Sequence, residues 1–507
     1  MKLKIYLLSS LAAITLASCD DYFSGMHIKN DYSPDISTVM SDASQYPSLL
    51  SGVCCSYWGA LLGYDNEAIW PLGTNSDQYA PGAGNFNLKT WSYYDGMEKP
   101  EIDNYDENAT FPKAIWYDFY GMINTIKDII TAINNGTVYT ENGQDANYKI
   151  LANANFLMGC CYTEMALLFD QCFIITEDTD MENISNENIA NATVTQATAL
   201  SYLNECIRIC KEHGDFTNLE NMFPNGTTAT GNKLCNLANF MAARCLAYFP
   251  RTKEETASVD WNKVLNYAEN GLQEDIIATL PNNDYGQWTM IQNSAPTGGW
   301  ARVGMRILKM MCPDDPNAQW PLPRDFGSTT TLPKLQSPDK RISTDFAYTP
   351  ENKSPAGTSF TGYTNYSPYS VNRFNDYATD GNGDEYLFPK TESDFIYAKA
   401  LLNTGATSKA ISIINNTRVN RGNLPEITSS SSANEINHAL YYERFIECGF
   451  PYPATSFYDR RRTPVDEFQL TTRSFRQLPI PYYELKTYGL ESYTFGGEKD
   501  ANSQYKF

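Results

Sequence analysis

Residues 388–422 have the sequence FPKTESDFIYAKALLNTGATSKAISIINNTRVNRG, and this stretch decides the fold class. On both sides of Gly405, apolar residues recur three or four positions apart, which is the spacing of an amphipathic helix. Gly405 is suited to end the first helix because glycine adopts the left-handed backbone of a helix C-terminus without strain. The stretch therefore predicts two helices, 391–403 and 406–420, joined by a short turn.

The same spacing recurs along much of the remaining chain. Several of the segments come in pairs joined by short turns, but they show no clean repeat of roughly 34 residues. This pattern predicts a mainly α fold in which tetratricopeptide-like helical hairpins stack into a scaffold. The further segments with helical spacing are 36–62, 112–133, 148–169, 195–212, 232–249, 259–273 and 433–448.

Two long regions, 63–111 and 276–390, lack this helical spacing. They are rich in Pro, Gly, Asn and Tyr, and they are too long to be simple connections between helices. Their density of Trp and Tyr argues against disorder. We therefore expect one helical domain over residues 19–507, with these two regions as loop excursions built out from the scaffold.

Charge and histidine content exclude several classes of function. The 507 residues carry 38 Lys and Arg against 59 Asp and Glu, a formal net charge of −21, which disfavours nucleic acid as a partner. The three histidines, His27, His213 and His438, are far apart in the sequence, which argues against a zinc hydrolase and most histidine acid–base catalysis. The sequence predicts neither a metal site nor a cofactor.

The N-terminus has the features of an export signal. Lys2 and Lys4 precede an apolar run, 5–16, that is too short to span a membrane. It ends in Leu-Ala-Ser-Cys at 16–19, the pattern of a bacterial lipobox. We expect residues 1–18 to be a lipoprotein signal peptide and Cys19 to be lipidated; the alternative is an ordinary secretory signal with an incidental cysteine.

Several motifs, taken in order, resemble the SusD/RagB family of nutrient-binding lipoproteins. Residues 388–422, which end in Asn-Asn-Thr-Arg-Val-Asn-Arg-Gly, resemble the family's late helical hairpin, whose usual ending is Ile-Asn-x-x-Arg-x-Arg-Ala-Gly. Residues 116–120 with Asn124 resemble a central helix. The chain departs from the family pattern at 152–159, where the usual Glu and Arg are missing, and at 451–453. The other matching segments are Glu443-Arg444-x-x-Glu447, the Asp-x-Arg-Arg motif within 459–462, and Leu-Pro-Ile-Pro-x-x-Glu at 478–484.

This resemblance implies a lipid-anchored protein of the Bacteroidetes outer membrane that faces the cell exterior. It implies binding of a glycan or another nutrient and delivery to a SusC-like TonB-dependent transporter, without catalysis. Glu443 and Glu447 lie on one helix face and invite comparison with a glycosidase acid and base. Beside Arg444 and the 459–462 cluster, we expect them to form structural ion pairs instead.

The two loop excursions supply the candidate ligand-binding residues. Sugars stack their C–H faces on aromatic rings, and their hydroxyls bind to amide, carboxylate and guanidinium groups. Five of the eight tryptophans lie in these excursions, although each of them is equally well explained as a core anchor. The candidate ligand-binding residues are Trp70, Asn75, Asp77, Trp91, Tyr93, Trp288, Trp300, Arg302 and Trp320.

Two other classes of protein remain open. A tetratricopeptide-like surface lipoprotein that binds only proteins or peptides would use the loop aromatics as core or partner contacts. An all-helical glycoside hydrolase would need two carboxylates facing each other across a cleft. The sequence does not distinguish among glycans, nor does it distinguish a glycan from a peptide as the nutrient.

Overall fold

The computed structural model describes most of the chain between residues 36 and 489. The expected signal peptide and Cys19 lie outside the described residues, as do Tyr93 and Trp288. The described residues are 36–62, 70–81, 88, 91–92, 110–219, 222, 230–280, 294–296, 300–322, 332–350, 367–374, 383–452, 454–471 and 474–489.

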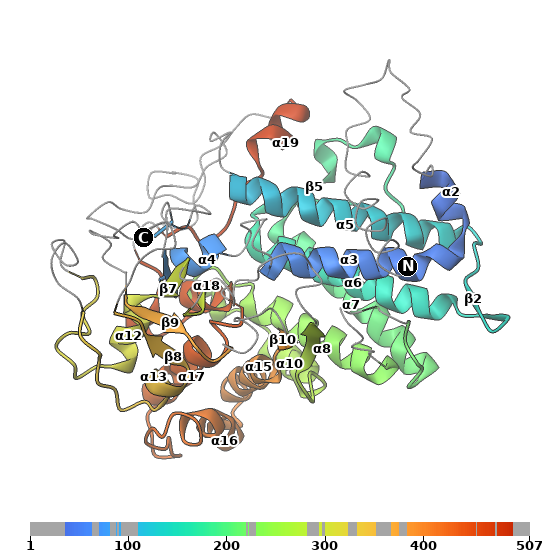
Figure 1. Ribbon diagram of the computed structural model, residues 1–507. Helices are drawn as coiled ribbons and strands as arrows, with labels where there is room; N and C mark the ends of the chain where they lie inside the picture. Colours follow the sequence, from blue (N-terminus) through green and yellow to red (C-terminus); the bar gives the residue numbers. More distant parts are fainter. Residues whose placement is uncertain are drawn as a thin grey trace.

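Long helices lie side by side at one end of the molecule (Figure 1). Helix α6 is buried along most of its length and contacts each of its neighbours. Gly159 permits the close packing of α6 on α7, because a Cβ atom there would lie 2.5 Å from Cγ of Leu203. These helices are α3 (Tyr46–Leu62), α5 (Thr110–Asn134), α6 (Asn147–Leu168), α7 (Ala192–His213) and α8 (Gly231–Tyr248).

The first predicted helix, 36–62, is interrupted. The chain forms α2 (Ile36–Ser41), the short 3-10 helix η1 (Ala43–Gln45) and then α3. Asp42 lies at the break, where its carboxylate accepts a hydrogen bond of 3.0 Å from the backbone N–H of Ser44. This local cap competes with a continuous helix, which the apolar spacing alone could not indicate.

The predicted hairpin at 391–420 is confirmed. Helix α15 (Lys390–Asn403) is followed by a turn at Gly405, whose φ is +90°, and α16 (Thr407–Arg418) begins directly afterwards. Helix α15 also packs on α10 (Trp261–Glu269) and on α17 (Ala433–Glu447), so hairpins continue through the second half of the chain. The protein is mainly α, with a tetratricopeptide-like scaffold.

Short antiparallel strand pairs join segments outside the helices. Strand β6 (Ile276–Leu280) pairs with β10 (Gly383–Phe388), so the start and the end of the second loop excursion lie together at its base. The other pairs are β1 (Tyr79–Pro81) with β7 (Ala301–Val303), β2 (Thr140–Glu141) with β3 (Gln144–Asp145), β4 (Gln171–Phe173) with β5 (Ile189–Asn191), and β8 (Phe346–Tyr348) with β9 (Tyr369–Val371).

The loop excursions contain more regular structure than the sequence pattern indicates. Helix α4 (Trp70–Asn75) lies in the first excursion, and α12 (Met305–Met311) and α13 (Arg341–Thr344) lie in the second. Each is two turns or shorter, and a periodic pattern needs a longer window to be recognised. The remaining helices are η2 (Met181–Asn183), η3 (Asn186–Asn188), α9 (Lys253–Thr256), α18 (Ala454–Arg462), η5 (Asp466–Phe468) and α19 (Tyr482–Thr487).

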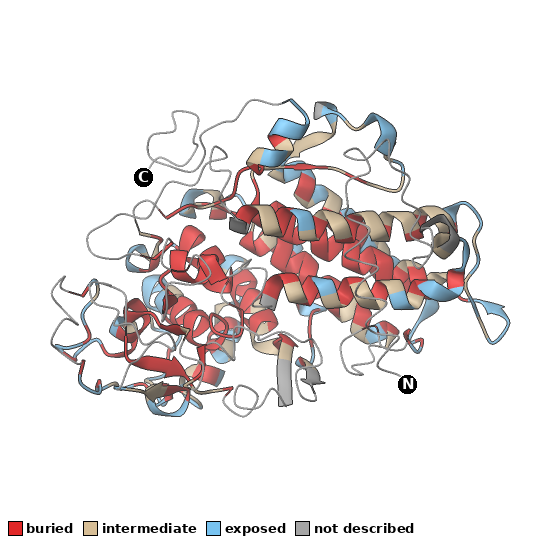
Figure 2. Cartoon of the chain, turned by 45° about the horizontal axis from the view of Figure 1, so that its top comes forward, coloured by how far each residue is buried: buried red, intermediate tan, exposed pale blue. Residues whose placement is uncertain are grey.

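The apolar core extends through the whole described chain. One cluster of buried apolar side chains runs from Ala43 to Leu485, and a smaller cluster fills the space among α15, α16 and α17. Figure 2 shows that burial is greatest where the helices face one another. Within the described residues, no helix is both long enough and apolar enough to cross a bilayer.

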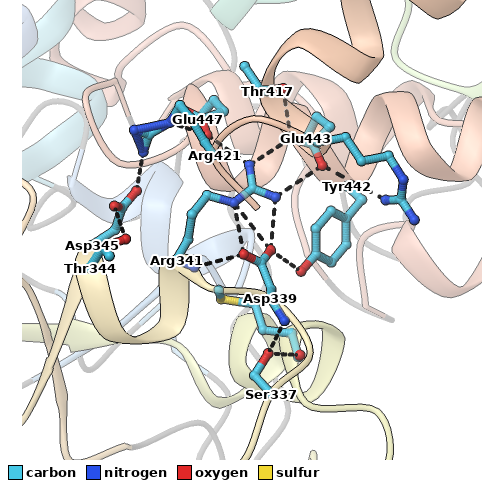
Figure 3. A network of polar contacts seen from close by, with 12 residues as sticks. Ser337, Asp339, Arg341, Thr344, Asp345, Thr417, Arg421, Tyr442, Glu443 and Glu447 are labelled. Carbon is cyan, nitrogen blue, oxygen red and sulfur yellow. Dashed lines mark hydrogen bonds and ion pairs between the residues drawn. The ribbon is translucent and has the colours of Figure 1, made fainter. Parts of the chain in front are cut away.

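Buried ion pairs tie α17 to the second loop excursion (Figure 3). Arg341 is fully buried; its Nη1 atom lies 2.6 Å from a carboxylate oxygen of Glu443 and 2.8 Å from one of Glu447, and Asp339 binds the same guanidinium. The predicted structural role of Glu443 and Glu447 is therefore confirmed. Their partners differ from the predicted ones: Arg341 and Arg373 of the second excursion gave no signal in the sequence pattern, and Arg444 binds Asp459 instead.

Candidate ligand-binding region

The structure brings parts of the two loop excursions together. Strand β1 of the first excursion pairs with β7 of the second, with Ala80 opposite Arg302. The backbone N–H of Gly304 extends the pairing by donating a hydrogen bond of 2.8 Å to the carbonyl of Gln78. Strand β7 also contacts β9. We call residues 70–81, 300–322, 346–349 and 367–371 the paired-loop region; in Figure 1 it lies to the left of the long helices, with α4 nearest to them and α12 farthest away.

Replacing Gly304 with alanine is expected to lower the free energy of unfolding by about 1–3 kcal/mol, the usual cost of overpacking. A Cβ atom at this position would lie 2.2 Å from the carbonyl oxygen of Asp77, so the backbone must move and weaken the β1–β7 junction. Urea denaturation measures the change. The matched control is Gly52→Ala in α3, where a Cβ atom has open space within 4 Å. If both variants keep the wild-type midpoint of urea denaturation, the backbone of Gly304 does not lie as close to the carbonyl of Asp77 as described here.

Asp77 and Arg306 hold the first excursion against α12. Asp77 has a φ of +57°, which is unusual for a residue with a side chain, and its Oδ2 atom lies 3.2 Å from Nη1 of Arg306. Burial lowers the pKa of the Arg306 guanidinium, and Asp77 opposes this effect. The guanidinium also lies 4.6 Å from the ring centroid of Trp320. The charge pair therefore fixes both the turn at Asp77 and the position of Trp320.

Five of the predicted ligand-binding side chains are buried, so in this structure they are not accessible to a ligand. Trp70 is 3% exposed and lies over the ring of Tyr79, and Trp91 is 7% exposed and meets Phe475 edge to face. The structure agrees with the alternative that these two tryptophans are core anchors. Phe475, which covers Trp91, is distant in the sequence, so sequence spacing could not reveal the burial of Trp91.

The three polar members of this buried set, Asn75, Asp77 and Arg302, make internal contacts. Asn75 donates a hydrogen bond of 3.0 Å to the carbonyl of Phe475. Arg302 donates to the hydroxyl of Thr349 at 2.9 Å and also to that of Ser370. These side chains stabilise the paired-loop region through internal hydrogen bonds and an ion pair. Their polar character is therefore accounted for without a direct contact to a ligand.

Trp300 and Trp320 keep partly exposed side chains, unlike Trp70 and Trp91. Trp300 directly precedes β7, and Trp320 packs on Arg306 of α12, so both belong to the paired-loop region. Among the predicted aromatics, these two are the described side chains that are accessible to a ligand. Sequence analysis missed Arg306, although a single arginine within the apolar stretch Met-Arg-Ile-Leu-Lys-Met-Met is the signal of a buried charge pair.

The described residues contain no grouping of three or more His, Cys, Asp or Glu side chains suited to a metal ion. Their cysteines carry free thiols, and most are buried in the core. His213 stacks on Tyr148, and His438 lies 2.8 Å from Glu467 at the surface. In the paired-loop region, the partly exposed indole rings of Trp300 and Trp320 offer apolar faces on which a ring-shaped ligand can stack.

Comparison with solved structures identifies the architecture. A SusD superfamily protein from Bacteroides vulgatus superimposes with a TM-score of 0.58 at 14% identity, over 89% of this chain and 99% of that one. The chain has the SusD-like fold. A SusD homolog from Bacteroides thetaiotaomicron matches with a TM-score of 0.58 at 14% identity, over 90% and 98% of the two chains. A laminarin-binding SusD-like protein matches with a TM-score of 0.51 at 17% identity, over 89% and 98%.

The SusD-like fold accounts for the order of motifs found in the sequence. Helix α5 contains 116–120 and Asn124, α15 and α16 form the late hairpin, and α17 and α18 contain the two charged motifs. No protein-family model and no curated protein sequence matches the chain. The similarity to SusD-like proteins therefore lies in the backbone fold, because most individual side chains differ at these low sequence identities.

Proposed function

We propose that this chain is a SusD/RagB-family lipoprotein that binds glycan at the cell surface through its paired-loop region. The β1–β7 pairing is the observation that carries the proposal, because it unites two aromatic excursions that are far apart in the sequence. The SusD-like fold supports it, since one structural relative is a laminarin-binding SusD-like protein and another, from Bacteroides vulgatus, is a SusD-like carbohydrate-binding protein.

In this proposal, Trp300 and Trp320 stack on sugar rings while nearby polar groups bind the hydroxyls. Arg306 and Asp77 act as positioning residues, because they hold Trp320 and the adjoining turn. No bond of the glycan is broken. The carboxylates of Glu443 and Glu447, which a hydrolase would need free, are both bound to Arg341.

The proposal places the chain at the outer membrane, anchored through lipid on Cys19 and facing the exterior. The protein then delivers the bound glycan to a SusC-like TonB-dependent transporter. In this arrangement the helical scaffold contacts the transporter barrel, and the paired-loop region faces the glycan. The lipobox at 16–19 and the family resemblance support this placement. Labelling of the expressed protein with a radioactive fatty acid, lost in Cys19→Ala, is the expected result for the lipid anchor.

Replacing Trp300 with alanine is expected to weaken glycan binding by about 30-fold, because losing one aromatic contact at the centre of a binding site costs roughly 2 kcal/mol. Affinity electrophoresis through gels that contain laminarin or other polysaccharides measures the effect. The control is Tyr267→Ala, which removes a half-buried ring from α10 on the helical scaffold.

Two results would contradict the proposal. If folded wild-type protein migrates unretarded through every polysaccharide, the nutrient is not a glycan, and a peptide ligand becomes the better hypothesis. If Tyr267→Ala loses retardation while Trp300→Ala keeps it, glycan binds to the scaffold and not to the paired-loop region.

A further inference from the structure

A pocket of about 240 Å³ lies between α5, residues 173–184 and the C-terminal helix α19. None of its lining residues belongs to the paired-loop region. Figure 1 shows α19 above α5, at a distance from β7, β8 and β9. The volume of the pocket is below the roughly 300–1,000 Å³ that is typical of pockets for drug-sized molecules. The pocket is therefore suited to a ligand of about one sugar residue.

The polar groups that line this pocket are rich in hydrogen-bond acceptors. Oδ1 of Asn124 is buried and accepts no hydrogen bond from any residue that the structure describes. Because this oxygen is buried below the pocket surface, a ligand in the pocket does not reach it in this structure. The carboxylates of Asp128 and Glu484 add further acceptors.

The lining has a negative character. No Lys, Arg or His side chain belongs to it. Nζ of Lys127 lies 3.0 Å from Oδ1 of Asp128 and offsets part of that charge. Burial raises the pKa of the Glu484 carboxyl, whereas hydrogen bonds from Tyr117 and Trp116 lower it. A carboxylate that has lost much of its hydration is stabilised by a cation placed beside it.

Aromatic rings form the other wall of the pocket. The rings of Trp116 and Tyr120 lie 4.8 Å apart, and those of Phe173 and Tyr488 lie 4.9 Å apart. The hydroxyl of Tyr120 donates to the carbonyl of Phe173 at 2.9 Å, so its donor is already used. Aromatic rings beside carboxylates favour ammonium groups, because the ring faces and the carboxylates both attract positive charge.

We propose that this pocket binds a small ligand carrying a protonated amine, such as an amino sugar. Asp128 and Glu484 accept hydrogen bonds from the ammonium group and adjacent hydroxyls, and the rings of Tyr120 and Tyr488 pack against its apolar face. Anionic ligands are excluded by the two carboxylates and by the lack of a cation among the lining residues. The site is independent of the proposed glycan-binding region, because different elements build it.

Isothermal titration calorimetry of the purified full-length protein with D-glucosamine, D-glucose and N-acetyl-D-glucosamine near pH 7 tests this proposal. The three sugars share one ring, but only glucosamine carries a protonated amine. We expect glucosamine to bind at least tenfold more tightly than the other two. The substitutions Glu484→Gln and Asp128→Asn should each weaken glucosamine binding about tenfold, whereas the exposed substitution Glu254→Gln should leave it unchanged.

Equal affinity for glucose and glucosamine would overturn the proposal, because the pocket would then recognise hydroxyls and not charge. Absence of glucosamine binding would overturn it as well. If Trp300→Ala abolishes glucosamine binding while Asp128→Asn does not, the amine binds at the paired-loop region and the assignment to this pocket is wrong. Asp128 is half-buried at the surface of α5, so this variant tests the pocket even if Glu484→Gln fails to fold.

Discussion

Replacing Arg341 with methionine is expected to lower the free energy of unfolding by about 3–5 kcal/mol, the cost of removing one partner from a buried ion pair. Arg341 is 0% exposed, and three carboxylates, those of Asp339, Glu443 and Glu447, bind its guanidinium. Without it, these charges remain in a site from which water is excluded. The substitution should also loosen the second loop excursion from α17, because Arg341 and Asp339 belong to the excursion.

Urea denaturation of the variant and the wild type measures this loss. Lys390→Met is the matched control, because Lys390 and Asp394 form an ion pair at the surface, where such pairs contribute about 0–1 kcal/mol. Burial already raises the pKa of Glu443, and loss of Arg341 should raise it further. The folded variant would then take up protons more readily than the unfolded chain, so it should regain stability as the pH falls from 7 to about 5. Equal midpoints for the Arg341 and Lys390 variants would contradict the account.

The stability of the wild type relative to Lys399→Met is expected to increase as the pH rises above 7. Lys399 is buried, and its pKa is lowered to about 7 from the ordinary 10.5, chiefly by burial and also by the charges of Arg462 and Arg444, while Asp459 opposes them. Between these two values the unfolded chain holds the proton and the folded chain does not. Stability therefore rises with pH, by up to about 1.4 kcal/mol per pH unit.

Urea midpoints of both proteins at pH 7, 8 and 9 measure this effect. Nζ of Lys399 donates a hydrogen bond of 2.9 Å to Asn437 and lies 5.5 Å from the ring centroid of Tyr441, so the neutral amine is accommodated in the folded chain. The wild type should gain stability relative to the variant at each step. A constant difference across this range would mean that Lys399 keeps its ordinary pKa in the folded protein.

The helical scaffold was predictable because its signals are local. Residues 391–403 and 406–420 carry their apolar spacing and their Gly405 terminator within a single stretch, and the structure confirms both helices. The ion pairing of Glu443 and Glu447 was also predicted, but not its partners: Arg341 and Arg373 come from the second excursion, whereas Arg444 and Arg462 bind Asp459 instead. The break at Asp42 was missed because one side-chain cap changes the path of the helix without changing its apolar pattern.

The candidate site was predictable only in part, because burial in the loop excursions depends on distant segments. Trp91 meets Phe475, and Asn75 binds the backbone of the same residue, so a segment near the C-terminus covers the first excursion. No local pattern distinguishes Trp91 from the more exposed Trp300. The pairing of β1 with β7 is likewise a long-range event between strands of three residues, which are too short to give an alternating signal.

Hydrogen–deuterium exchange of the full-length protein, with and without a polysaccharide that retards it in affinity gels, tests the central claim most directly. The account predicts that bound glycan slows exchange in residues 70–81 and 300–322 and leaves α7 and α16 unchanged. Exchange that slows only in the helical scaffold, with 300–322 unaffected, would contradict the assignment of glycan binding to the paired-loop region.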